Sequence, residues 1–335
     1  MITPSIMYLT PEDVQEVGLP YETVCHLVES VFVEHSNNRF EMPAKTAMHP
    51  YDNTFVHIMP GYLPKFESLG CKYIMAWFDN PKKDLPSLGG LIVLNDLATG
   101  LPMAIMDTSW ISNVRTAAVT AIAIKYLARR NAEVLGIVGT GLQARQHAAL
   151  LNDVAPNIKT LVVYDINPEV AQEFKKDVEK YTRFNVNLCH SAEEAIKSAD
   201  IVVTITGMLK PKTYLLDWVQ TGTLVLPVHA GGWDPKLLHR ADLLIFDDYL
   251  QCKSFFGNPG GQYYPLPEDY CQLGEIVSGQ KEGRIDDNQV IVNINLGMSL
   301  HDIRIAPIIL DKAIDMGLGT KLPYNVKATR IPLSD

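Results

Sequence analysis

The stretch Glu133–Ala148, EVLGIVGTGLQARQHA, decides the fold of this chain. Its first half is an apolar run of strand character, its centre is a glycine-rich turn, and its second half continues as a helix. This order is typical of a βαβ unit that binds a dinucleotide. Gly139 permits the tight turn, Gly141 lets the backbone approach a pyrophosphate, and Ala144 stands where close packing of helix on strand accepts only Gly or Ala. The helix N-terminus then offers free N–H groups to the phosphates.

A second strand, KTLVVYD, ends at Asp165, a little over twenty residues after the turn. A carboxylate at this strand end can accept hydrogen bonds from both ribose hydroxyls of NAD, whereas it would repel the 2′-phosphate of NADP. The next residues, Ile166 and Asn167, are not basic. The sequence therefore predicts NAD as cofactor. The alternative is a structural glycine turn followed by a surface aspartate, which the joint pattern disfavours.

The chain around this turn alternates between apolar strands and helices from about residue 130 to 300. Continuous Val/Ile/Leu strands separated by helices imply a parallel sheet that is covered on both faces. We therefore predict a Rossmann-type, doubly wound α/β domain over residues 126–304. The strand-like segments are EVLGIVG, KTLVVYD, DIVVTIT, GTLVLPVHA and ADLLIFDD.

The part of the chain before this region has a different rhythm. A helix is predicted over residues 10–38, with Thr10 as its start signal. Extended runs follow, and the last of them reads as an antiparallel hairpin around Gly100. The tail at residues 298–319 is a further helix that we expect to return to this part. Residues 1–125 with 305–335 are therefore predicted to form a second, α+β domain for substrate binding and dimerisation.

Composition limits the classes of partner. The chain has 335 residues, 47% apolar and 20% charged, with a net charge of −9. That is enough apolar material for two domains, and the acidic balance argues against nucleic acid and anionic membranes as partners. The cysteines are odd in number and lack CxxC spacing, so neither a disulfide framework nor a metal site is predicted. No secretory signal or membrane-spanning run is present, which leads us to expect a cytoplasmic protein.

Several cationic side chains stand beside apolar segments of the first domain. Lys72 lies inside the strand-like run LGCKYIMAWF, Lys45 lies in MPAKTAM, and Arg115 opens a helix. A cation at a helix N-terminus is unfavourable unless an anion also binds there, and a substrate carboxylate would be such an anion. The alternative for Lys72 is a strand-edge lysine with its ammonium in water. His57 is interpreted as a core histidine rather than a catalytic one.

These segments together resemble the ornithine cyclodeaminase/μ-crystallin family, which includes an alanine dehydrogenase and ketimine reductases. The resemblance covers about residues 7 to 320 and follows the family order of motifs. The motifs are MPAK, CKYIMAWFDNP with LPSLGG, ATGLPMAIMD, VRTAA, GIVGTGLQA and VVYD.

The resemblance implies a role for each matching residue. Lys45 and Arg115 would hold the substrate carboxylate, with Leu296 beside them, and Lys72 would be catalytic by polarising the C2 substituent. The family is also typically dimeric through the first domain, which implies a homodimer. The dinucleotide would be contacted by Ser87, Thr116, Gly139, Thr140, Gly141, Gln143, Ala144, Asp165, Thr206, Val228, Lys236 and Asn295.

One position departs from the family pattern. Many catalytic members have an aspartate four residues before the lysine that matches Lys236, and here that position is Gly232. That carboxylate would handle the proton on the substrate nitrogen. Asp234 could replace it, although Asp before Pro is also an ordinary turn residue, and His229 is its rival. We expect Trp233 to form part of the pocket wall.

The sequence thus favours an NAD-dependent oxidoreductase that acts on the C2–N bond of a small α-amino or α-imino acid. A cyclodeaminase with recycled NAD is the second hypothesis, because the same imine could be attacked by a side-chain amine. The third is a nucleotide-dependent binding protein without turnover, as μ-crystallin members can be, and the glycine at position 232 supports it.

Overall fold

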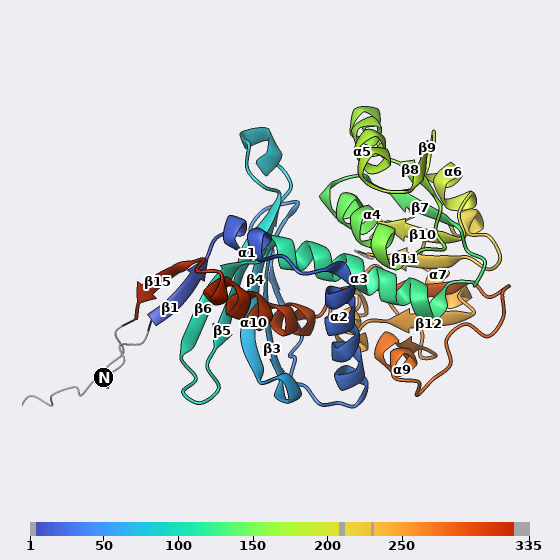
Figure 1. Cartoon of the computed structure of the whole chain (residues 1–335). Coiled ribbons are helices and arrows are strands. Elements are labelled where there is room, and N and C mark those ends of the chain that lie inside the picture. The colour runs from blue at the N-terminus through green and yellow to red at the C-terminus, as the bar shows by residue number, and fades with distance from the viewer. Residues whose placement is uncertain (1–4, 208–211, 229–230, 325–335) are drawn as a thin grey trace, which may run out of the picture.

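The computed structural model describes residues 5–207, 212–228 and 231–324, which form two lobes (Figure 1). The first lobe is built on a seven-stranded mixed sheet and the second on an eight-stranded parallel sheet. The mixed sheet has the order β15 (Thr320–Pro323), β1 (Ser5–Leu9), β6 (Pro102–Asp107), β5 (Leu88–Asn95), β4 (Ser68–Trp77), β3 (Thr54–Leu63) and β2 (Thr46–Met48).

The parallel sheet confirms the predicted Rossmann-type fold class, because each of its strand pairings is parallel. Its interior strands are short, apolar and mostly buried, as expected for a sheet with helices on both faces, whereas the two edge strands are partly exposed. Its order is β13 (Cys271–Gln272), β12 (Leu243–Phe246), β14 (Ile291–Ile294), β11 (Leu224–Pro227), β10 (Ile201–Thr204), β7 (Val134–Val138), β8 (Thr160–Tyr164) and β9 (Asn185–Leu188).

The helices complete both lobes. In the second lobe they include α4 (Leu142–Val154), α5 (Pro168–Tyr181), α6 (Ala192–Lys197), α7 (Lys236–Arg240), η3 (Leu216–Trp218), α8 (Tyr249–Phe256) and α9 (Leu273–Val277). The remaining helical elements are α1 (Pro11–Val17), α2 (Tyr21–Ser36), η1 (Pro64–Phe66), η2 (Asn80–Lys83), α3 (Ser109–Leu127) and α10 (Ser299–Asp315). No helix in the described part of the chain is both long and apolar enough to cross a membrane.

The single helix predicted over residues 10–38 is wrong, because the structure has two helices there. Thr10 and Asp13 form the expected capping box at the start of α1. The helix then ends at Gly18, whose φ is +39°. Pro20 follows, and a proline disfavours helical backbone at the residue before it. The hairpin between β5 and β6 is confirmed, with Gly100 at a φ of +72° in its turn.

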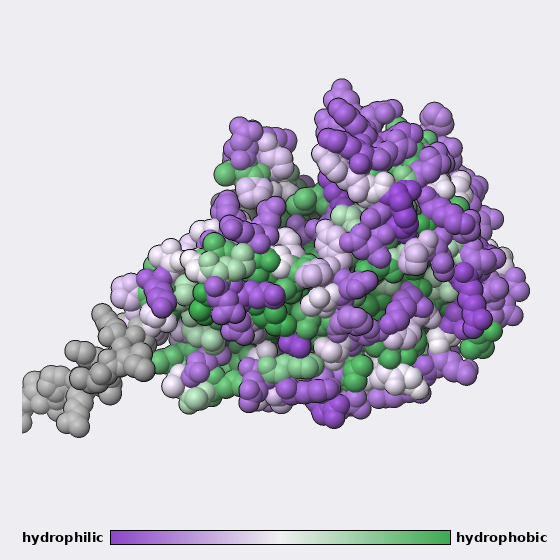
Figure 2. Space-filling model, viewed as in Figure 1, coloured by the Kyte–Doolittle hydropathy of each residue, from purple (hydrophilic) through white to green (hydrophobic). Residues whose placement is uncertain are grey.

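Two helices position the lobes relative to each other. The long helix α3 runs from the first lobe into the second (Figure 1), and one apolar cluster includes Ile92 of β5, Val119 of α3 and Leu135 of β7. Helix α10 returns to pack over β3 and β4, as predicted for the tail. Figure 2 shows the surface hollowed between the lobes, beside the loop that carries η2. The cleft therefore lies where the ends of the parallel strands face the mixed sheet.

Candidate active site

The glycine-rich turn between β7 and α4 has two glycines with different reasons to be there. Gly139 has a φ of +97°, and a Cβ there would lie 2.7 Å from the carbonyl oxygen of Ile205. The fold itself therefore requires this glycine. Gly141 has an ordinary φ of −74°, and a Cβ there would meet no atom within 4 Å. The protein leaves open space above Gly141, as the approach of a pyrophosphate requires.

The carboxylate of Asp165 lies directly beside this turn. Its Oδ2 accepts hydrogen bonds from the backbone N–H of Thr140 at 2.7 Å and from the Thr140 hydroxyl at 3.0 Å. Its Oδ1 accepts the N–H of Asn167. The first turn of α4 has no side-chain cap, and Ala144 is fully buried within it. A strand-end carboxylate next to an uncapped helix N-terminus suits the ribose and phosphates of NAD.

A cavity of about 70 Å³ lies between α3 and the ends of β11, β12 and β14. Asn295 lines it and is only 6% exposed, yet neither its amide nitrogen nor its amide oxygen has a partner among the described residues. A buried amide without hydrogen bonds is costly, and the carboxamide of a nicotinamide would complement both atoms. The residues present therefore fit NAD. The lining consists of Arg115, Thr116, Val119, Val228, Asp247, Asn295, Leu296 and Gly297.

Lys72 is a fully buried lysine on β4, an interior strand of the mixed sheet. Its Nζ lies 2.8 Å from Oδ1 of Asp302, which is also fully buried. The alternative of a strand-edge lysine in water is therefore excluded. The Nε of Arg115 lies 3.5 Å from the other carboxylate oxygen, Oδ2. Strand β4 and helices α3 and α10 thus bring three charges together, and of these Arg115 lines the cavity.

Lys45 approaches the same place from the segment before β2. Its Nζ donates to the carbonyl oxygen of Leu296 at 2.9 Å and lies 5.3 Å from the ring centre of Phe255. Ala47 pairs with His57, and Met59 pairs with Lys72. Because His57 and Met59 are two residues apart on β3, all four side chains lie on the same face of the sheet. Burial lowers the pKa of Lys45 and that of Lys72 to about 8 each. Both ammonium groups can therefore exchange protons near neutral pH.

Two acidic residues of the site were missed from the sequence. Asp302 is one, and Asp247, directly after β12, is the other. Asp247 lines the cavity and accepts the N–H of Gly297 at 2.5 Å, and burial raises the pKa of its carboxyl. An acid at the end of a buried parallel strand was a readable signal for Asp247. No local pattern marks Asp302, which sits within an amphipathic helix.

Trp233, which precedes Asp234, does not lie where the sequence predicted. Trp233 is fully buried in the core of the second lobe, and its Nε1 donates to the hydroxyl of Thr204 at 3.1 Å. It does not line the cavity, so the prediction of a pocket wall is wrong. The preceding Gly232 has a φ of +89°, and Trp233 forms a β-bridge with Tyr214. This pairing turns the indole inward.

Of the other predicted residues, Asp234, Lys236 and His57 are absent from the cavity lining. The carboxylate of Asp234 accepts the N–H of Lys236 at 3.0 Å, and Lys236 itself is exposed at the start of α7. His57 is buried and stacked on Phe55, as the core interpretation expects, although its Nε2 has no partner among the described residues. His229 lies outside the described residues.

Three other predicted cofactor residues, Gln143, Thr206 and Ser87, are absent from the cavity lining. Gln143 donates to Asn113 of α3 at 2.8 Å, which links α4 to the bridging helix. Thr206 lies against Gly139, and its hydroxyl is 3.2 Å from that of Tyr214. Ser87 precedes β5, where its carbonyl oxygen accepts the N–H of Trp77.

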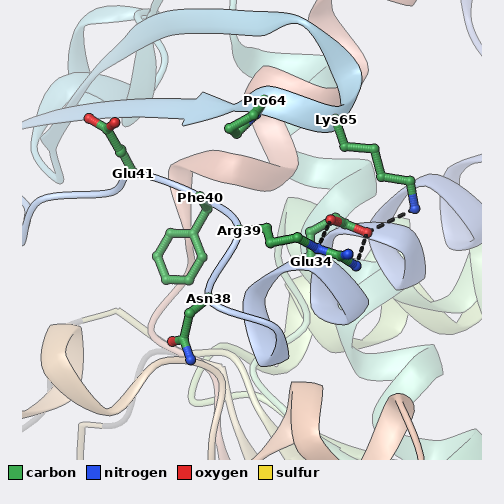
Figure 3. Close-up of a pocket in the computed structure, with 7 residues that line it drawn as sticks. All are labelled: Glu34, Asn38, Arg39, Phe40, Glu41, Pro64 and Lys65. Carbon is green, nitrogen blue, oxygen red and sulfur yellow. Dashed lines mark hydrogen bonds and ion pairs between the residues drawn. The ribbon is translucent and has the colours of Figure 1, made fainter.

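A larger hollow, of about 600 Å³, lies in the first lobe at the end of α2 (Figure 3). Figure 3 shows the fully buried Glu34 between Arg39 and Lys65, each of which has an ion-pair distance of 2.8 Å to it. Phe40 and Pro64 form part of the wall. None of the predicted site residues lines this hollow, whereas Arg115, Thr116, Val228, Asn295 and Leu296 line the smaller cavity.

Comparison with known proteins gives a consistent result. The sequence profile of the ornithine cyclodeaminase/mu-crystallin family matches residues 6–317. The nodulation efficiency protein NfeD of Rhizobium meliloti is 35% identical over 97% of this chain and 100% of its own length.

Two solved structures share the fold over nearly the whole chain. The Δ1-pyrroline-2-carboxylate reductase of Thermococcus litoralis, in complex with NADH and L-proline, is 29% identical, with a TM-score of 0.82 over 94% of this chain and 99% of its own. A dimeric archaeal alanine dehydrogenase with bound NAD is 28% identical, with a TM-score of 0.84 over 95% of this chain and 99% of its own.

The two glycines of the turn give opposite predictions. Gly139→Ala should lower the free energy of unfolding by about 2 kcal/mol, because the backbone is left-handed and the new Cβ meets a carbonyl oxygen. Gly141→Ala should leave the urea midpoint unchanged but weaken NADH binding about tenfold, measured by fluorescence titration. Unchanged NADH affinity in Gly141→Ala would contradict the assignment of this turn.

Proposed function

This chain belongs to the ornithine cyclodeaminase/mu-crystallin family, and on that premise we propose that it is an NAD-dependent oxidoreductase acting on the C2–N bond of a small α-amino or α-imino acid. One observation carries the proposal: Arg115, a cation suited to a carboxylate, and Asn295, an amide suited to a nicotinamide, line the same cavity. Relatives with NADH and L-proline or with NAD support it.

The three cationic side chains are proposed to contact different groups of the substrate. Arg115 and Lys45 would hold the substrate carboxylate, since a guanidinium and an ammonium from two elements fix both its position and its plane. Lys72 would face the C2 substituent and polarise it. NAD or NADH supplies the hydride chemistry at C2 when bound. The burial of these side chains excludes water from the imine, and orientation at about 3 to 3.5 Å accounts for much of the rate.

The reaction can be tested directly. We expect oxidation of NADH, seen as loss of its nicotinamide absorbance, with small cyclic imino acids or with 2-keto acids plus ammonia. Lys72→Met should lower kcat by about 100-fold or more while NADH still binds. Ammonia release from a diamino acid without net absorbance change would favour the cyclodeaminase. Tight binding of NADH and substrate without any turnover would favour the binding protein.

The proton-handling group is assigned to Asp234, with His229 as its rival. Asp234 is held by the N–H of Lys236, and Asp234→Asn keeps an oxygen for that hydrogen bond while removing the acid. We expect this variant to lower kcat/KM by about 100-fold with an unchanged melting temperature. His229→Asn is the companion variant. Full activity in Asp234→Asn with loss in His229→Asn would transfer the role to the histidine.

We also propose that the protein is a homodimer through the first lobe. Ile58 pairs with Tyr73, which pairs with Leu91, so these residues form a row across β3, β4 and β5 on the face opposite Lys72. They are 37%, 44% and 39% exposed. An apolar row on a sheet face suits a second copy of the chain, and the similar alanine dehydrogenase is a dimer.

A charge in this row should separate the two copies. Tyr73→Asp is expected to convert a dimer of wild-type protein into a monomer, because the carboxylate would be buried without a partner in the interface. Analytical ultracentrifugation measures the change. Tyr181→Asp is the matched control, since Tyr181 is 71% exposed at the end of α5. A wild-type monomer, or a Tyr73→Asp dimer, would refute the interface.

A further inference from the structure

Three charged residues, Lys72, Arg115 and Asp302, form one connected group beside the cavity. The carboxylate of Asp302 lies between Lys72, whose Nζ is 2.8 Å away, and the Nε of Arg115, 3.5 Å away. Lys72 and Asp302 are both fully buried, and the two residues are 230 positions apart in the sequence. This carboxylate lies between two cations that the proposed reaction needs. Of the three residues, Arg115 lines the cavity, whereas Lys72 and Asp302 do not.

We infer that Asp302 is a positioning residue, which keeps the Lys72 ammonium charged and turns the Arg115 guanidinium so that its outer nitrogens face the cavity. The inference rests on the proposed function. Arg115 is contacted from two sides: its Nε forms an ion pair with Asp302 at 3.5 Å, without a hydrogen bond, and its Nη1 lies beside Gly297. A Cβ at Gly297 would lie 3.0 Å from that Nη1. The substrate then meets a guanidinium whose orientation is already set.

The charge state of Lys72 depends on this carboxylate. Burial disfavours the ammonium and lowers the pKa of Lys72 from its ordinary 10.5 to about 8, whereas the Asp302 charge opposes that shift. The value of about 8 already includes repulsion by Arg115 and Lys45, which also lowers the pKa of Lys72. Burial raises the pKa of the Asp302 carboxyl, but the charges of Lys72 and Arg115 and the hydrogen bond from Lys72 outweigh it and hold that pKa below its usual range. The other titratable groups that feel the Lys72 charge are His57 and His301.

Removal of Asp302 therefore has a predictable sign. Between pH 8 and 10.5 the unfolded chain holds a proton on Lys72 that the folded protein has lost, so stability rises with pH across that window. Asp302→Asn removes the attraction, and the pKa of Lys72 in the folded protein should fall by about 1 to 3 further units. The pH range over which stability rises then begins at a lower pH. The destabilisation caused by Asp302→Asn should shrink as the pH rises from about 6 to about 8.

The experiment is a pH series of urea unfolding on the dinucleotide-free protein. It compares wild type, Asp302→Asn, Lys72→Met and the double variant in a cycle. The pH-dependent part of the Asp302→Asn effect is expected in the wild-type background and absent in the Lys72→Met background. Glu34→Gln is the matched control, because Glu34 is an equally buried, paired carboxylate whose partners Arg39 and Lys65 are more than half exposed. Its effect should be independent of pH over this range.

A pH dependence that is the same with and without Lys72 would overturn the inference. If Asp302→Asn alone does not fold, the double variant is expected to fold, because it removes both buried charges, and an unfolded double variant would equally overturn it. Relative to the wild-type enzyme, the alkaline limb of kcat/KM should move to lower pH in Asp302→Asn and return to its wild-type position in Asp302→Glu. If the protein shows no hydride transfer, the proposed function is refuted. The unfolding result would still stand, because neither substrate nor dinucleotide is present in the unfolding experiment.

Discussion

The site depends on one constraint, which is that a buried ammonium needs a partner. Lys72 has no exposed surface, and an isolated ammonium inside a protein would lose its proton or unfold the chain. Asp302 meets this need from α10, and removing one member of such a pair typically costs about 3 to 5 kcal/mol. Helix α10 must therefore return from the second lobe onto β3 and β4. The path of the chain and the charge of the cleft are set by the same contact.

The shared helix α3 explains how the two halves of the site keep their distance. It carries Arg115 and Thr116 into the cavity, while its apolar residues lie in a cluster that continues into both sheets. Thr120 of α3 is 2.9 Å from His147 of α4, and Gln143 bonds to Asn113. A cation that must meet a substrate and a helix N-terminus that suits phosphates are thus fixed to one rigid element.

The sequence predicted the features whose chemistry is local. The turn at residues 139–144 could be recognised because its glycines, its helix and the strand before it are contiguous, and Asp165 follows at a regular distance. Features made by distant residues were out of reach. Asp302 acts across 230 positions. Trp233 was predicted to line the pocket because it follows the end of a predicted strand, where ligands bind in open α/β sheets. In the structure, the bridge to Tyr214 and the hydrogen bond from its Nε1 to Thr204 hold its indole in the core.

Gly232 shows why a residue should be judged with its backbone. The resemblance implies an aspartate at this position in many catalytic members, so the glycine first suggests that the proton-handling carboxylate is missing. In the structure this residue has a φ of +89°, its carbonyl oxygen accepts the N–H of Tyr214, and it precedes an inward-facing indole. An aspartate at that φ would be strained, so the loop conformation and the glycine belong together. The segment after β11 is held in this conformation by Trp233, whose indole lies in the core, and the proposed proton-handling residue Asp234 follows it directly.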